Sequence, residues 1–65
     1  METHFVVSSE TYAEKARRLL ERYRYRFRMH KVSAVAGCAY HFRVSAPAAA
    51  IFALLQAGGI PYQTN

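Results

Sequence analysis

The chain has 65 residues, a formal net charge of +5 and a hydrophobic fraction of 52%. That length allows one domain, and that hydrophobic fraction suffices for a core, so a second domain and wholesale disorder are excluded. The single cysteine cannot form an internal disulfide and suits a reducing, cytoplasmic setting. No signal peptide is expected at the start, and the longest apolar run, 46–55, is too short to span a membrane.

The first part of the chain predicts a strand and then a helix. Residues 3–8 are rich in β-branched and aromatic side chains, which favours a strand. Ser8 and Ser9 can cap a helix, and Glu10 suits its first turn. From Glu10 to about Arg22 the apolar residues recur at helical spacing, so an amphipathic helix is predicted there.

The middle of the chain predicts two strands joined by a hairpin. Basic and apolar residues alternate strictly over 22–30, which is typical of a strand with one buried face. Residues 33–37 suit a hairpin connection because Gly37 can adopt conformations closed to other residues. Residues 38–44 alternate again and predict the next strand.

The last part predicts a second helix and a final strand. Ser45 and Pro47 suit the start of a helix over 48–57, and the two glycines after it suit its end. Residues 60–63 predict a strand at a sheet edge, because Pro61 has no backbone donor.

This order of elements, βαββαβ, predicts an α+β fold, a ferredoxin-like sandwich that occupies residues 1–65 as a single domain. Two helices would cover one face of a four-stranded antiparallel sheet. The apolar residues of the alternating segments would point at the helices. The basic residues would then lie on the uncovered face of the sheet.

The predicted topology gives Cys38 a distinctive position. The strand that holds it starts at the sheet end where the first strand finishes, so we expect Cys38 near Ser9 and the first helix N-terminus. His30 and Lys31 are expected at the same end. A helix N-terminus and nearby cations favour the thiolate, which is the nucleophilic form of cysteine. The alternative is a core cysteine, because Cys38 shares its face with aromatic residues.

Three short motifs carry a resemblance. Residues 12–20 read Tyr-Ala-Glu-Lys-Ala-Arg-Arg-Leu-Leu, residues 37–40 read Gly-Cys-Ala-Tyr, and residues 54–60 read Leu-Leu-Gln-Ala-Gly-Gly-Ile. In these motifs the chain resembles a family of small bacterial proteins described as selenium or sulfur carrier-like. Ala39 stands where the family pattern has a second glycine, and the preceding loop lacks the expected proline.

The resemblance implies a carrier rather than an independent enzyme. Cys38 would be the reactive residue and hold sulfur or selenium as a persulfide or selenopersulfide, received from a donor protein and passed to an acceptor. Gly37 would shape its turn. His30, Lys31 and Ser9 are expected to support the thiolate on topological grounds alone. No cofactor is implied.

A second interpretation is a small basic homo-oligomeric module with no chemistry, which binds nucleic acid or an acidic protein. Arg24, Arg26, Arg28 and Arg43 would form its anion-binding face. Because the aromatic residues of the alternating strand should point at the helices, base stacking is not expected. The histidines lack zinc-motif spacing, so no metal site is predicted.

The second helix predicts self-association. It is apolar nearly all round, and Ala50, Ala53, Leu54 and Ala57 are expected to face outward. Small outward residues permit close contact between helices, so another copy of the chain is the expected partner.

Overall fold

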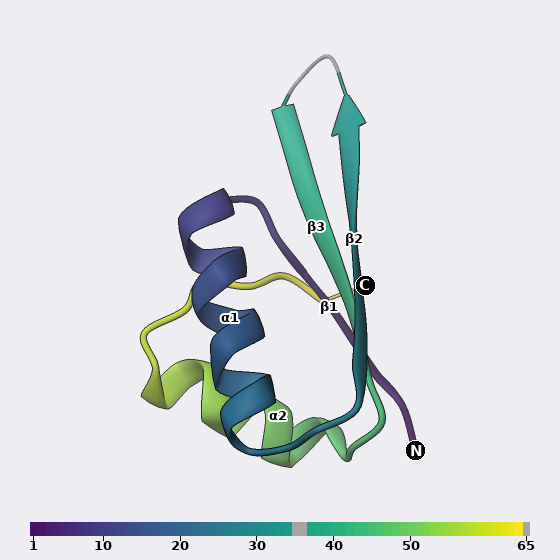
Figure 1. Cartoon of the computed structure of the whole chain (residues 1–65), viewed down its shortest axis with the longest axis vertical. Coiled ribbons are helices and arrows are strands. Elements are labelled where there is room, and N and C mark those ends of the chain that lie inside the picture. Colours follow the sequence, from purple (N-terminus) through teal and green to yellow (C-terminus); the bar gives the residue numbers. More distant parts are fainter. Residues whose placement is uncertain (35–36, 65) are drawn as a thin grey trace.

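The computed structural model describes residues 1–34 and 37–64, which form an antiparallel sheet with two helices on one of its faces (Figure 1). The predicted α+β class is confirmed. Within the described residues no helix is long and apolar enough to cross a membrane. The elements in chain order are β1 (Thr3–Val7), α1 (Glu10–Arg22), β2 (Phe27–Ala34), β3 (Gly37–Val44) and α2 (Ala48–Ala57).

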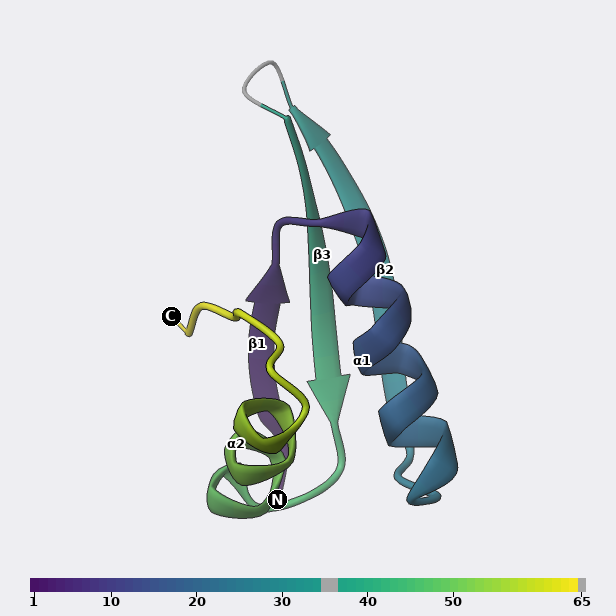
Figure 2. The ribbon, with the colours of Figure 1, turned by 90° about the vertical axis from the view of Figure 1, so that its left-hand side faces the viewer.

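The sheet has the strand order β1-β3-β2, so the strand that comes last in the sequence occupies its centre. Figure 2 shows α1 and α2 together on one side of this sheet. Phe5 of β1 stacks on Phe42 of β3, with ring centroids 4.7 Å apart, and both side chains are fully buried. Leu20 of α1 and Leu55 of α2 are fully buried in the same core. Burial of such side chains supplies most of the folding free energy of a domain this small.

The register decides which side chains share a face of the sheet. In β3, Tyr40, Phe42 and Val44 are buried, whereas the residues between them point away from the helices. Directly opposed residues of antiparallel strands lie on the same face. We call the side away from the helices the open face. It consists of His4 and Val6 of β1, Arg28, His30 and Val32 of β2, and Ala39, His41 and Arg43 of β3.

The helix α1 has the predicted bounds. Ser9 is its N-cap, and the Ser9 hydroxyl lies 3.5 Å from the Tyr12 backbone N–H, at the long end of the hydrogen-bond range. At the other end, Arg24 adopts a left-handed backbone with φ 61°, and the Tyr25 N–H donates to the Leu20 carbonyl. This is a Schellman ending, in which arginine takes the place that glycine usually holds.

The second strand therefore begins later than predicted. The alternation over 22–30 predicted a strand throughout, but its first part completes α1 and the turn, and β2 covers Phe27–Ala34. The predicted hairpin connection is correspondingly shorter, because β2 continues to Ala34 and β3 starts at Gly37, with φ 129°. Residues 35–36 of that connection lie outside the described residues.

The predicted fourth strand is not formed in the described residues. Gln63 makes an isolated antiparallel bridge to Val6, with backbone hydrogen bonds of 2.8 Å in both directions. The Ile60 N–H donates to the Leu55 carbonyl and so still belongs to the end of α2, while Pro61 has no N–H to donate. Too few backbone groups remain in the segment to extend this bridge into a strand.

Candidate functional site

Two arginines lie directly opposite each other on the open face, near the end of the β2–β3 ladder that is far from Ala34 and Gly37. Arg28 of β2 pairs with Arg43 of β3, and both side chains are exposed. Like charges in directly opposed positions destabilise a sheet. Within the described part of the chain, the one carboxylate that meets either guanidinium is Glu2, whose Oε1 lies 3.8 Å from Arg43 Nη1. This part of the face therefore keeps an excess of positive charge.

All three histidines lie on the open face, one on each strand. His4 Nε2 and His41 Nδ1 are 3.2 Å apart and share a hydrogen bond, in which one ring donates and the other accepts. Their ring planes differ by 18°, and the His30 plane differs from that of His41 by 14°. His30 is exposed, whereas His4 and His41 are half-buried. The three imidazoles thus have nearly parallel planes across the sheet.

Two of the histidines, His30 and His41, line a common hollow with Arg28 and Arg43. A groove of about 490 Å³ is bounded by Glu2, Arg28, His30, His41, Arg43 and Ser45. An adjoining groove of about 240 Å³ shares several of these residues and extends to Arg26 and Phe27. The arrangement offers guanidinium and imidazole donors to an anion. In the described residues, no group of three or more histidine, cysteine or acidic side chains is arranged to hold a metal ion.

The predicted arginine face is present in part. Arg28 and Arg43 lie on the open face, and Arg26 precedes β2 and lines the adjoining groove with them. Arg24 is in the turn after α1. The physical reason is the Schellman ending, which uses residues that would otherwise have continued the alternation. The sequence interpretation placed His41 on this face but did not group it with His4 and His30. Their common location depends on strand register, which the sequence pattern did not supply.

Cys38 is exposed, so its interpretation as a core residue is wrong. It lies on the same side of β3 as the buried residues, but the β2–β3 hairpin extends past the helices (Figure 1). Its described contact is with Ser33, whose Oγ lies 3.9 Å from the cysteine Sγ. Opposite Cys38 across the ladder is the same Ser33, and Gly37 pairs with Ala34.

The three residues expected to support the thiolate lie in different parts of the structure. Lys31 is on the same side of the sheet as Cys38, where its Nζ lies 6.0 Å from the centre of the Tyr40 ring. His30 is on the open face, the opposite side of the sheet from Cys38. Ser9 caps α1. The strand alternation that separates His30 from Lys31 was readable from the sequence, and it allows only one of them to share a side with the cysteine.

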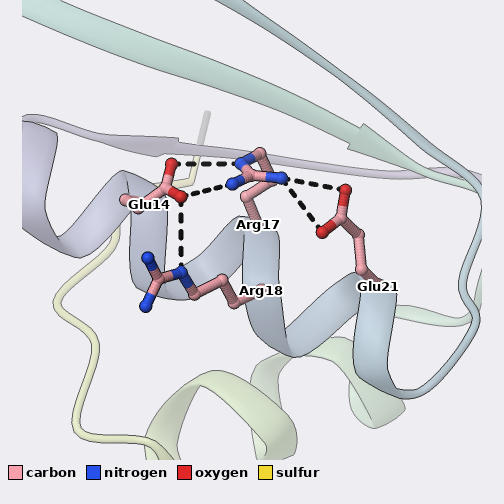
Figure 3. A network of polar contacts seen from close by, with 4 residues as sticks. All are labelled: Glu14, Arg17, Arg18 and Glu21. Carbon is pink, nitrogen blue, oxygen red and sulfur yellow. Dashed lines mark hydrogen bonds and ion pairs between the residues drawn. The ribbon is translucent and has the colours of Figure 1, made fainter.

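The exposed side of α1 shows the opposite electrostatic arrangement from the open face. Arg17 bonds to both Glu14 and Glu21, and Arg18 also reaches Glu14 (Figure 3). The hydrogen bond from Arg17 is the main reason that the pKa of Glu14 is lowered, and the same contact raises the pKa of Arg17. A hollow of about 780 Å³ along this helix is lined by Glu10, Thr11, Tyr12, Glu14, Lys15 and Arg18. Its charges are of both signs, and Glu14 pairs with Arg18.

The helix α2 presents small residues to solvent. Ala50, Ala53 and Ala57 are exposed, while Leu54 is partly buried against the core. Leu54 therefore contributes less to an outward surface than predicted, because its side chain packs partly against the core.

Comparison of the sequence with protein-family models found no match, and comparisons with curated proteins and with solved structures found none either. The resemblance to carrier-like proteins therefore remains an expectation. Functional inference depends on the residues of the open face and of the β2–β3 hairpin.

Proposed function

We propose that the protein is a small basic binding module whose open face holds a polyanion through Arg28 and Arg43. The observation that carries this proposal is the direct opposition of the two guanidinium groups beside a groove. Their mutual repulsion is unfavourable in the free protein, and a phosphate or similar anion placed between them would remove it. Guanidinium groups also match the geometry of phosphate oxygens, to which they donate paired hydrogen bonds.

The hydrogen-bonding capacity of the groove supports the same role. His30, His41 and Ser45 line it together with the arginines, so an anion there would meet several donors. Glu2 is the opposing influence, because its carboxylate competes for Arg43. Glu2 is exposed and close to the chain start, and an exposed ion pair of this kind contributes at most about 1 kcal/mol. A polyanion with several phosphates outweighs it.

The proposal extends to the fold. We assign the domain to the ferredoxin-like βαββαβ class, with segment 60–63 in the position of a reduced fourth strand. The support is the bridge between Val6 and Gln63, which lies on the edge of β1 away from β3. In such a fold the sheet face without helices is a known position for nucleic-acid contacts.

The test is binding of a labelled polyanion, measured by fluorescence anisotropy over a range of salt concentrations. Unstructured RNA is the probe, and the wild type should bind with an affinity that falls steeply as salt rises. The variant Arg28→Gln/Arg43→Gln should bind more weakly, and its log–log salt slope should be smaller by about one for each lost contact.

The matched control is Lys15→Gln/Arg22→Gln, which removes the same charge from the exposed side of α1. It should bind nearly as well as the wild type. Absence of binding at low salt would sink the proposal, and so would an equal loss in the control, because binding would then reflect net charge alone.

A second candidate function is the sulfur or selenium carrier, favoured by the exposure of Cys38 on the projecting hairpin. The Cys38 thiolate would attack the outer sulfur of a donor persulfide. A new S–S bond forms as the donor's S–S bond breaks, and the donor leaves as a thiolate, so no external oxidant is needed. The same displacement applies to selenium. A lone exposed thiol persists in a reducing compartment, so this role presupposes a cytoplasmic protein.

Mass spectrometry tests the carrier role. After incubation with a cysteine desulfurase and cysteine, the wild type should gain the mass of one sulfur, and Cys38→Ser should not. The thiol is first shown to be accessible by alkylation. An accessible thiol that acquires no sulfur would remove the carrier role and leave the binding role unaffected.

We further propose self-association through α2, using the exposed Ala50, Ala53 and Ala57 together with the partly buried Leu54. The support is the absence of charged residues from this helix and the small size of its outward side chains, which allows close approach of a second copy. Sedimentation velocity at micromolar concentration should give a species larger than the monomer, and Ala53→Glu should dissociate it. A monomeric wild type would contradict the proposal.

A further inference from the structure

We infer that the polyanion bound at the open face is single-stranded nucleic acid, whose bases stack on His4, His30 and His41. This inference rests on the proposed polyanion binding and names its ligand. It departs from the expectation that base stacking would not occur at this face.

The geometry of the imidazoles is the first support. The His4 and His41 rings share an N–H···N hydrogen bond of 3.2 Å. Their ring centroids are 5.4 Å apart and their planes differ by 18°, so the two rings form a nearly parallel, stacked pair. His30 adds a third ring at a centroid distance of 5.7 Å from His41 and in nearly the same orientation. A hydrogen bond that restrains the rings before binding reduces the entropy lost on binding.

The position of the cations relative to the rings is the second support. His4 is directly opposite Arg43 across the β1–β3 ladder, and His30 is two residues from Arg28 along β2. Two residues of strand span roughly 7 Å, so phosphates held by the arginines would leave their bases within reach of the rings. An acidic peptide could use the arginines, but its carboxylates would have no use for three parallel rings. Nucleobases use both.

The flat shape of the open face favours a single strand over a duplex. In a duplex the bases are stacked on each other, so their flat faces are covered and cannot stack on the histidine rings. A duplex therefore offers this face its phosphates and base edges but no base to stack on. A single strand can turn its bases toward aromatic side chains, and this stacking tolerates any base sequence.

The experiment compares three labelled probes by fluorescence anisotropy at one salt concentration. They are a short oligothymidylate, an abasic oligonucleotide of the same length, and a duplex. The wild type should bind oligothymidylate roughly fivefold or more tightly than the abasic strand, which corresponds to the lower limit for stacking of one base. It should also bind oligothymidylate more tightly than the duplex.

Two variants assign the difference to the rings. His30→Ala, on the exposed edge strand, removes a ring and also one donor to the phosphates, so it should weaken binding of oligothymidylate by a larger factor than binding of the abasic strand. His41→Phe keeps a ring but cannot carry a charge, so it should retain the preference, whereas His41→Ala should lose it. Circular dichroism checks that each variant is folded, and His30→Ala provides the test should the substitutions in the central strand unfold the domain.

The outcomes separate the two proposals. Equal affinities for oligothymidylate and the abasic strand would overturn base stacking and leave polyanion binding standing. Tighter binding of the duplex would overturn the choice of a single strand. Failure of all three probes to bind would overturn the proposed function itself.

Discussion

The exposed side of α1 and the open face of the sheet are both rich in arginine, but the arginines have different neighbours in the two places. On α1, Arg17 lies between Glu14 and Glu21 and bonds to both. On the open face, Arg28 lies opposite Arg43, and both point into solvent beside a groove. The helix pairs Arg17 and Arg18 with its own glutamates, whereas the sheet places Arg28 and Arg43 opposite each other.

The difference follows from the two backbone geometries. In a helix, residues three and four apart are neighbours, so acidic and basic residues at those spacings pair within one segment. In a sheet, neighbours come from different strands, and the register alone decides whether charges attract or repel. Cations that remain opposed in the folded sheet weaken its stability, a cost that is consistent with the binding role proposed for them.

The largest expected effect contrasts the two sides of β3. Phe42→Ala removes a fully buried ring from the core and should destabilise the domain by about 3–5 kcal/mol. A chain of this length has a total stability of roughly 3–10 kcal/mol, so this loss is a large share of the total. The neighbouring His41→Ala, on the open face, should cost less than about 1.5 kcal/mol, mainly from its lost hydrogen bond. Urea unfolding measures both, and similar losses would contradict the distinction between the two sides.

The next effect separates an arginine of the turn from the arginines of the open face. Arg24→Gly relieves a left-handed backbone and should raise the free energy of unfolding by about 1 kcal/mol. Its affinity for RNA should be nearly unchanged, since Arg24 is outside the open face. The matched control is Gly59→Ala at φ 68°, where the added methyl meets no neighbouring atom and only backbone strain is introduced. That control should lose a similar amount of stability. A drop in RNA affinity for Arg24→Gly would show that Arg24 also belongs to the RNA-binding surface.

A smaller effect tests whether the open face trades stability for binding. Arg28→Glu places a carboxylate opposite Arg43 and should stabilise the sheet by about 0.2–1 kcal/mol. The same change should abolish most of the RNA affinity. Arg28→Gln, which removes the repulsion without adding an ion pair, should lie between the two in stability. If Arg28→Glu were less stable than the wild type, the opposition of the arginines would not be a cost to folding.

The smallest effect concerns the paired cations of α1. The pKa of Glu14 is lowered in the folded state, chiefly by the hydrogen bond from Arg17. A lowered folded pKa stabilises the protein above the unfolded pKa, and this contribution disappears as the pH falls through the folded pKa. Glu14→Gln should therefore be slightly less stable than the wild type at neutral pH and equally stable in acid. Because the network is exposed, the difference should shrink in high salt. Thermal unfolding at both pH values measures it, and a difference that grew in acid would refute the sign.

The elements whose signals are local were predictable from the sequence. The bounds of α1 followed from the Ser9 cap and the apolar periodicity, and α2 matched the range between Pro47 and the two glycines. The first strand and β3 also agreed closely with their predicted ranges. The start of β2 was predicted too early because α1 ends with Arg24 in a left-handed conformation. Glycine is the usual residue at this position, so an arginine gives no sequence signal for the end of the helix. The fourth strand failed because pairing of segment 60–63 depends on β1 and not on its own composition.

Composition and periodicity therefore specified the α+β class, the two helices and the strands β1 and β3, because these depend on residues close together in the chain. The tertiary structure alone decided that His4, His30 and His41 meet on one face with Arg28 and Arg43, and that Cys38 projects beyond the helices. The reason is physical: contacts across a sheet depend on register, and a shift of one residue would send each of these side chains to the other face.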